Sequence, residues 1–362
     1  MVIKNFFIGI LIIVKIAFGN AQEVLRTPSS LVFSGYIETY FSYDFANPGN
    51  HVRPEFVYSH NKHNELNLNL GVAKVFYEHK NVHANLAIMA GTYPEYNMAN
   101  EQNLLKNVFE ANVGVKISAK HNLWVDAGIM PSHIGFESAI GKDCANVTRS
   151  ILADNSPYYE AGVKIGYTTL SKRWYMAALY LNGWQRIKKI EGNQTPAFGT
   201  QVTYKPSVKT TLNWSTYFGN EQPDSDRKYR FFNNLFGQFV LSDQLNVTVG
   251  LDVGFQQATY KSQKYDTWFS PILILQYKPT TTVQLAARGE YYEDEKGVII
   301  GFTNPNGFKT YGFSTNFDYL VANNVMFRIE ARKLFSNNNV FITNGAAANI
   351  NTFITTSLAV SF

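Results

Sequence analysis

Apolar and polar residues alternate with a period of two along much of the chain. Between residues 245 and 255, every odd position is apolar, and polar residues or glycine fill the positions between them. Successive side chains of a β-strand point to opposite faces, so this stretch predicts a strand with one apolar and one polar face. The same pattern recurs at 123–129, 283–291, 325–332 and 354–362. The chain is therefore expected to be all-β.

The connections between these stretches alternate between short and long. Short ones are expected near 80–81, 118–122, 170–173, 205–209, 241–244, 278–281 and 320–324, and long ones near 46–63, 93–107, 131–155, 185–196, 219–229, 258–266, 294–307 and 335–350. Seven short and eight long connections join 16 strands. The remaining residues give about 11 per strand, close to what a tilted strand needs to cross a bilayer. Short turns at one end and long loops at the other are typical of outer-membrane barrels. The sequence therefore predicts a closed antiparallel transmembrane β-barrel of 16 strands, with 14 strands as the alternative.

Aromatic residues gather at two depths on the apolar faces of the predicted strands. One group lies beside the short turns and comprises Tyr167, Tyr175, Tyr204, Tyr277 and Tyr319. A second group lies near the long loops and comprises Tyr159, Phe218, Phe231, Phe255, Phe269 and Tyr291. Two such belts are typical of a barrel in a membrane. A soluble β-sandwich, the alternative fold, would place these residues mid-strand in its core. Pro271 lies inside a predicted strand, and its missing N–H predicts a bulge or a position near the rim.

The first 21 residues have the pattern of a secretory signal peptide. Lys4 precedes an apolar stretch at 6–14, and Gly19 and Ala21 supply the small residues before the expected cleavage site. An N-terminal anchor helix is the alternative, although the apolar stretch is shorter than such a helix needs. The mature chain, 22–362, is then a single barrel domain, and its expected location is the outer membrane of a Gram-negative cell.

The composition agrees with a membrane barrel. Charged residues make up 16% of the chain, which also contains 22 Tyr and 27 Phe. A typical soluble domain has roughly 25% charged residues. Cleavage would remove Lys4 and Lys15 and lower the formal charge from +5 to +3, too small an excess to indicate a nucleic-acid partner. The single cysteine, Cys144, excludes a disulfide scaffold.

Several segments resemble a known family. The first predicted strand reads Ser-Gly-Tyr-Ile-Glu-Thr-Tyr-Phe-Ser-Tyr-Asp-Phe over 34–45. A central segment reads Trp-Val-Asp-Ala-Gly-Ile-Met-Pro-Ser-His-Ile-Gly-Phe-Glu over 124–137, followed by Thr-Arg-Ser at 148–150 and Pro-Tyr-Tyr-Glu-Ala-Gly at 157–162. This loose pattern is similar to that of the OmpL-like β-barrel porins common in Bacteroidetes. The resemblance implies an outer-membrane channel, with no defined catalytic residues and mostly unassigned substrates.

Charged residues on the polar faces of the predicted strands are candidates for a channel wall. Arg288, Arg328 and Arg332 fall on two strands that are separated by one other strand, so they could form a basic ladder. Stripes of charge set ion preference in pores. The alternative is that these arginines pair with Glu290 and Glu330 and only hold water in the lumen.

The longest expected connection, 131–155, is a candidate constriction that folds into the barrel, with an outward surface loop as the alternative. Glu137, Arg149 and Asp154 lie in this segment and would place both signs of charge across the channel. Cys144 is expected to be a packed residue rather than a reactive thiol. The candidate pore-lining residues are therefore Glu137, Arg149, Asp154, Arg288, Glu290, Arg328, Glu330 and Arg332.

No residue pattern indicates catalysis, and neither a metal nor a cofactor is expected. All seven histidines precede residue 134, and pairs such as His60 and His63 fall short of the three or four ligands of a metal site. Neither Gly-x-Ser-x-Gly nor His-Glu-x-x-His is present. The chain is therefore not expected to be an enzyme.

Three functions remain for such a barrel. It could be a porin for passive diffusion of small hydrophilic solutes or ions, with at most a mild anion preference. It could instead be a surface-binding or adhesion barrel that acts through its extracellular loops. A transporter with a plug domain is disfavoured because only 22–30 precede the first predicted strand. Sixteen strands leave an aqueous channel, whereas eight are filled by side chains, so the strand count favours the porin. The expected partners are outer-membrane lipid and small hydrophilic solutes, and a homo-oligomer is left open.

Overall fold

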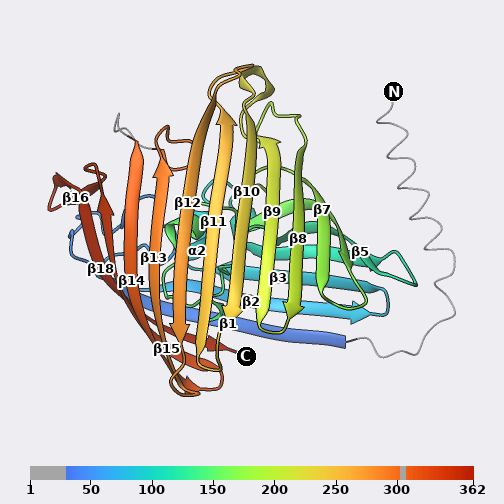
Figure 1. The fold of residues 1–362 in the computed structure, drawn as a ribbon, viewed down its shortest axis with the longest axis horizontal. Helices are drawn as coiled ribbons and strands as arrows, with labels where there is room; N and C mark the ends of the chain where they lie inside the picture. Colours follow the sequence, from blue (N-terminus) through green and yellow to red (C-terminus); the bar gives the residue numbers. More distant parts are fainter. Residues whose placement is uncertain (1–29, 302–306) are drawn as a thin grey trace.

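A closed antiparallel barrel of 16 strands makes up nearly all of the computed structural model (Figure 1), which describes residues 30–301 and 307–362. The barrel strands are β1 (Ser30–Asp44), β2 (Leu66–His79), β3 (Val82–Ala90), β4 (Val108–Lys116), β5 (Asn122–Pro131), β6 (Tyr159–Thr168), β7 (Trp174–Leu181), β8 (Ala197–Ser207), β9 (Thr210–Asn220), β10 (Tyr229–Val240), β11 (Leu245–Gln257), β12 (Tyr265–Tyr277), β13 (Val283–Asp294), β14 (Phe308–Ala322), β15 (Val325–Ser336) and β18 (Ile350–Ser361). Each strand pairs with its neighbours in the chain, and β1 pairs with β18. The predicted 16-strand barrel is confirmed. The predicted signal peptide lies outside the described residues.

The connections alternate as predicted, with seven short turns at one end of the barrel and eight long connections at the other (Figure 1). The long connections carry the remaining elements, which are α2 (Thr92–Asn97), α3 (Ile151–Asp154), the 3-10 helices η1 (Leu105–Asn107), η2 (Gly141–Asp143) and η3 (Asp224–Asp226), and a hairpin of β16 (Phe341–Thr343) and β17 (Ala346–Ala348). In outer-membrane barrels the short turns are periplasmic and the long loops extracellular. No helix among the described residues is long and apolar enough to cross a membrane.

The seam between β1 and β18 closes the ring. Its pairing runs from Tyr36 opposite Ser361 to Asp44 opposite Phe353. Gly35 and Phe362 extend the seam by exchanging two backbone hydrogen bonds of 2.7 and 3.0 Å. A side chain at Gly35 would overlap the Phe362 ring, which would then have to move aside. Because the ring is closed, no barrel strand leaves a free edge.

The two faces of the wall differ in the way that the alternation predicts. On β11, Val249 points outward and is 41% exposed, whereas its near neighbour Asp252 is buried inside the barrel. At the level of the short turns, the outward rings of Trp174 and Tyr204 stack 4.1 Å apart. Outward apolar residues flanked by aromatic rings form the surface that a barrel presents to lipid.

Tyr175 lies on the inner face, so its predicted place in the lipid-facing belt is wrong. The reason is that both faces of β7 are apolar. Leu179 and Leu181 point into the barrel and are buried, while Trp174 and Tyr180 point outward and are exposed. A strand that is apolar on both faces gives no period-two signal from which its orientation can be read.

Pro271 lies in the middle of β12, where neither a bulge nor the rim accommodates it. The pairing of β12 with β13 keeps one register on both sides of the proline, with Phe269 opposite Glu293 and Ile272 opposite Glu290. This register places Pro271 opposite Tyr291. Proline has no N–H to donate to the Tyr291 carbonyl, and the Ser270 hydroxyl donates to that oxygen instead, at 2.6 Å. A side chain therefore replaces the missing ladder hydrogen bond.

Replacing Val249 by arginine is expected to lower the free energy of unfolding by about 2–4 kcal/mol, because a charge at mid-depth on the lipid face must be desolvated. Thr248→Arg is the matched control, because Thr248 precedes Val249 on β11 and lines an internal cavity. Urea unfolding in lipid vesicles measures both variants. Equal costs for the two variants would mean that the outer face is assigned wrongly.

Candidate functional site

The connection between β5 and β6, residues 132–158, lies inside the barrel and is called the inner loop below. At its start, the Ser215 hydroxyl on β9 donates to the His133 carbonyl at 2.7 Å. Further along, the Val147 N–H donates to the Asn316 side chain on β14 at 3.0 Å, and the Lys142 N–H donates to the Tyr36 hydroxyl on β1 at 3.3 Å. The loop also contacts β13, where Arg288 donates to the Thr148 carbonyl. β13 lies eight strands from β5 in either direction around the ring. The inner loop therefore crosses the lumen to the opposite wall.

Three wall arginines hold the inner loop by its backbone, and they are called the arginine clamp below. Arg288 donates to the Thr148 carbonyl at 2.7 Å, and Arg332 donates to the Arg149 carbonyl at 2.8 Å. Arg328 donates to two carbonyls, those of Gly141 at 2.7 Å and Cys144 at 2.8 Å. The first two arginines thus fix one stretch of the loop and Arg328 fixes another.

Acidic residues on β13, β14 and β15 pair with the clamp. Glu330 lies 2.9 Å from Arg288, and Asp318 lies 2.7 Å from Arg328. Glu290 pairs with Arg332 and also accepts the Ile151 N–H at 2.7 Å. Glu330 in addition accepts the Thr148 N–H at 2.6 Å. These carboxylates therefore neutralise the arginines and satisfy backbone donors of the inner loop.

Glu137, Arg149 and Asp154 of the inner loop are also buried. Glu137 accepts the Ser150 N–H at 3.2 Å and lies 3.8 Å from Arg288. Arg149 donates to three carbonyls of its own loop, including that of Val147 at 2.7 Å. Asp154 instead accepts from the connection between β1 and β2, where Ser59 donates its hydroxyl at 3.0 Å.

The structure therefore brings all eight candidate residues together around the inner loop, but it does not expose the predicted basic ladder to an open lumen. Arg288, Arg328 and Arg332 do lie one strand apart on β13 and β15, yet they are buried and paired. The physical reason is that the loop carbonyls and the wall carboxylates surround them. Whether these residues set the width of a channel stays a prediction. Cys144 is buried at the tip of the loop, and burial raises the pKa of its thiol.

Two buried residues of the lumen, Asp318 and Arg53, were not among the predicted candidates. Only Asp318 could have been found from the sequence. Asp318 lies opposite Arg328 across the two-residue turn between β14 and β15, so hairpin register alone could have paired them. Arg53 lies in the connection between β1 and β2, where the sequence has no alternation of apolar and polar residues from which its position could be predicted. Its guanidinium lies 3.4 Å from the centre of the Phe353 ring and donates to the His60 carbonyl at 3.1 Å.

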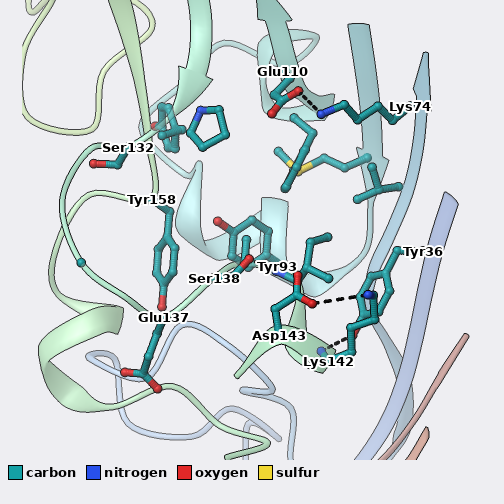
Figure 2. A pocket seen from close by; sticks show the side chains of 18 of the residues that line it. Tyr36, Lys74, Tyr93, Glu110, Ser132, Glu137, Ser138, Lys142, Asp143 and Tyr158 are labelled. Atoms are coloured by element: carbon teal, nitrogen blue, oxygen red, sulfur yellow. Dashed lines mark hydrogen bonds and ion pairs between the residues drawn. The ribbon is translucent and has the colours of Figure 1, made fainter. Parts of the chain in front are cut away.

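Two cavities lie beside the inner loop in the part of the chain that the structure describes. The larger, of 730 Å³, lies between the loop and β1–β4, and the smaller, of 400 Å³, lies between the loop and β9–β13. Figure 2 shows that Lys74 and Glu110 form an ion pair on the wall of the larger cavity, while Lys142 and Asp143 form another at the tip of the loop. Lys142 and Asp143 line both cavities. The inner loop therefore separates two spaces of the lumen, each lined by polar as well as apolar side chains.

The extracellular half of the lumen contains a buried apolar cluster. Inward residues near the extracellular strand ends, such as Trp268 on β12 and Phe353 on β18, belong to it. Phe56, Ile300 and Phe341 join the cluster from long connections. The long connections thus pack onto the wall above the inner loop, and the Asn155 side chain ties the two levels together by donating to the Phe56 carbonyl at 3.1 Å.

Asp154→Asn is expected to flatten the pH dependence of stability. Burial raises the pKa of Asp154 to about 7, although the Arg332 charge and the Ser59 hydroxyl lower it. Because the folded state holds this proton more tightly than the unfolded state, the stability it contributes is present below about pH 4 and is lost as the pH rises through about 7. Urea midpoints measured across this range test the change. Asp143→Asn, at an exposed carboxylate, is the control and should keep the wild-type slope. The assignment fails if Asp154→Asn keeps that slope as well.

No group of three or more potential ligand residues that could hold a metal is found within 30–301 and 307–362. The clamp arginines and their carboxylate partners are instead engaged in holding the inner loop.

Comparison with solved structures identifies barrels of the same fold. An anion-selective porin from Comamonas acidovorans aligns with a TM-score of 0.60 at 9% identity, covering 92% of this chain and 100% of that one. The outer-membrane-expressed OmpT of Vibrio cholerae aligns with a TM-score of 0.60 at 9% identity, covering 94% and 100%. The outer-membrane channel DcaP of Acinetobacter baumannii aligns with a TM-score of 0.60 at 12% identity, covering 92% and 97%. These identities are low enough that the likeness concerns the fold.

None of the curated proteins matches this sequence. Residues 30–362 do match the family model described as "Putative beta-barrel porin-2, OmpL-like". The chain therefore belongs to this family of outer-membrane porins.

Proposed function

We propose that the protein is a passive diffusion channel for small hydrophilic solutes or ions, and that the inner loop forms its narrow section. The observation that carries the proposal is the inner loop itself, which crosses a 16-strand barrel and leaves two cavities beside it, each lined by polar as well as apolar side chains. A wall of this size encloses more space than its own side chains fill. A loop held by buried ion pairs limits that space. A channel needs no catalytic residue, and none is assigned.

The proposal includes export by a signal peptide that is cleaved after Ala21 and insertion into the outer membrane. The apolar outer face and the aromatic residues at the level of the turns support this location. One of the similar structures is described as a trimer form of OmpT. A homo-oligomer of this chain stays a prediction, which the mass of the detergent-purified protein would test.

Weak charge selectivity is expected, because cations and anions lie side by side around both cavities. Lys74 and Glu110 are 2.7 Å apart, and Lys142 and Asp143 are 3.4 Å apart. Lys209 and Lys278 line the smaller cavity and have no ion pair with a described residue, so any anion preference originates there. Lys209→Glu with Lys278→Glu is expected to shift the reversal potential toward cations. Lys188→Glu with Lys261→Glu, at exposed extracellular positions, is the control. Equal shifts in the two variants would place the selectivity elsewhere.

Planar-bilayer recording of the purified protein tests the proposal. Steady channels are expected, and vesicles that contain the protein should swell in small sugars but not in large ones. A folded barrel that gives no channels in either assay would overturn the proposal. The extracellular loops would then carry the function, as in an adhesion barrel.

A further inference from the structure

The periplasmic end of the barrel carries a strong excess of positive charge. The seven short turns contain seven charged residues, of which only Asp243 is acidic. The six basic residues are Lys80, Lys120, Lys172, Arg173, Lys209 and Lys278. The extracellular connections taken together instead mix both signs, as between β9 and β10, where 221–228 holds three acidic and two basic residues. The positive charge is therefore a property of one end of the barrel.

Two of these cations and a third from a strand end gather at the periplasmic ends of β6, β7 and β8. Lys172 and Arg173 lie in the turn between β6 and β7, and Lys205 lies near the end of β8. The Lys205 N–H donates to the Arg173 carbonyl at 2.7 Å, which brings the two residues side by side. All three side chains are exposed, and none forms an ion pair with a described residue. This site, Lys172, Arg173 and Lys205, is called the rim cluster below.

An aromatic pair adjoins the rim cluster on the lipid-facing side. Trp174 follows Arg173 and Tyr204 precedes Lys205 in the sequence, and their rings stack 4.1 Å apart on the outer wall. Trp174 is 41% exposed. Interfacial aromatic rings lie at the level of the headgroups. Exposed cations therefore lie where headgroup phosphates would be, directly beside rings that would contact acyl chains.

We propose that the rim cluster and the Trp174–Tyr204 pair bind an anionic phospholipid of the periplasmic leaflet. The phosphate contacts the cations, and the upper part of an acyl chain lies along the stacked rings. Clusters of Lys and Arg beside a membrane attract anionic lipids in this way. A soluble acidic macromolecule could contact the cations, but it could not reach rings on the face that lipid covers. The aromatic pair therefore favours a lipid over a soluble partner.

Native mass spectrometry of the detergent-purified barrel, titrated with phosphatidylglycerol or phosphatidylcholine, tests the proposal. Wild-type protein should retain phosphatidylglycerol more tightly than phosphatidylcholine. The variant Lys172→Asn with Arg173→Gln and Lys205→Gln should bind phosphatidylglycerol roughly tenfold or more weakly, since each cation near the surface contributes appreciably. Asparagine is chosen at position 172 because the backbone there has a φ of 57°, which asparagine tolerates. Trp174→Ala with Tyr204→Ala should weaken binding of both lipids.

The matched control neutralises three exposed cations at the other end of the barrel, Lys188, Lys264 and Lys296, and should bind lipid like the wild type. Inorganic phosphate at the lipid concentration should not displace phosphatidylglycerol. The proposal is overturned if the rim-cluster variant retains phosphatidylglycerol like the wild type, or if wild-type protein does not distinguish the two lipids. Binding of soluble polyglutamate that depends on the rim cluster, without lipid preference, would instead indicate an acidic macromolecular partner.

Discussion

Replacing Arg328 by methionine is expected to lower the free energy of unfolding by about 3–5 kcal/mol, because it leaves a buried carboxylate without its partner. Arg328 is buried, lies 2.7 Å from Asp318 and donates to the carbonyls of Gly141 and Cys144. Methionine fills much of the same volume but offers no donor to any of these three acceptors. The loss therefore combines an unpaired charge with two unsatisfied carbonyls.

Urea unfolding in lipid vesicles measures this effect, and Lys333→Met is the matched control. Lys333 lies on the same strand as Arg328 but points outward and is exposed, so its replacement should change stability little. Adding Asp318→Leu to Arg328→Met should restore part of the loss, because an apolar pair no longer buries a lone charge. A single variant as stable as the wild type would show that the clamp does not hold the inner loop.

Removing the inner loop is expected to raise the single-channel conductance several-fold. The suitable variant lacks 137–150, carries glutamine at Arg288, Arg328, Arg332, Glu290 and Glu330, and carries asparagine at Asp318, which would otherwise lose its partner Arg328. Deleting the loop alone would leave these buried charges without their loop partners, and the barrel would then be at risk of misfolding. With the wall neutralised, the two cavities merge into one wide lumen, as a 16-strand barrel allows.

Planar-bilayer recording compares this variant with the wild type and with a barrel in which 259–263, an exposed extracellular connection between β11 and β12, is shortened. The shortened control should conduct like the wild type. If the loop-deletion variant folds and conducts no better, the narrow section lies elsewhere, and the apolar cluster of the extracellular half becomes the next place to examine.

The barrel could be predicted from the sequence because its wall is built from local alternation. A strand such as β11 alternates over 245–255, and a short turn joins it to the strand before it. β7 could not be oriented in this way, since both of its faces are apolar. The position of Pro271 was predicted wrongly, because the hydroxyl of the preceding serine replaces the missing ladder hydrogen bond. No pattern in the sequence indicates such a replacement.

An inward fold of 131–155 was one of the two predicted alternatives, but the contacts that hold the inner loop could not be predicted, because they join residues far apart in the sequence. The Thr148 N–H and the Glu330 carboxylate that accepts it are 182 residues apart. Alternation could place Arg288 and Arg328 on the inner face, but it could not show that loop carbonyls rather than water would surround them. A partial signal was the interleaving of arginine and glutamate along the inward positions of β13 and β15, which indicates pairing more than a continuous basic stripe.

The tip of the inner loop also has a consequence for assembly. Residues 141–144 bind Arg328 on β15, and within the same stretch the Lys142 N–H donates to the Tyr36 hydroxyl on β1. β18 is the one strand between β15 and β1, so the tip bridges the seam where the first and last strands of the sheet meet. Before those strands join, the open sheet offers only part of this binding surface. Sealing the barrel and seating the loop are therefore coupled, and each step makes the other harder to reverse.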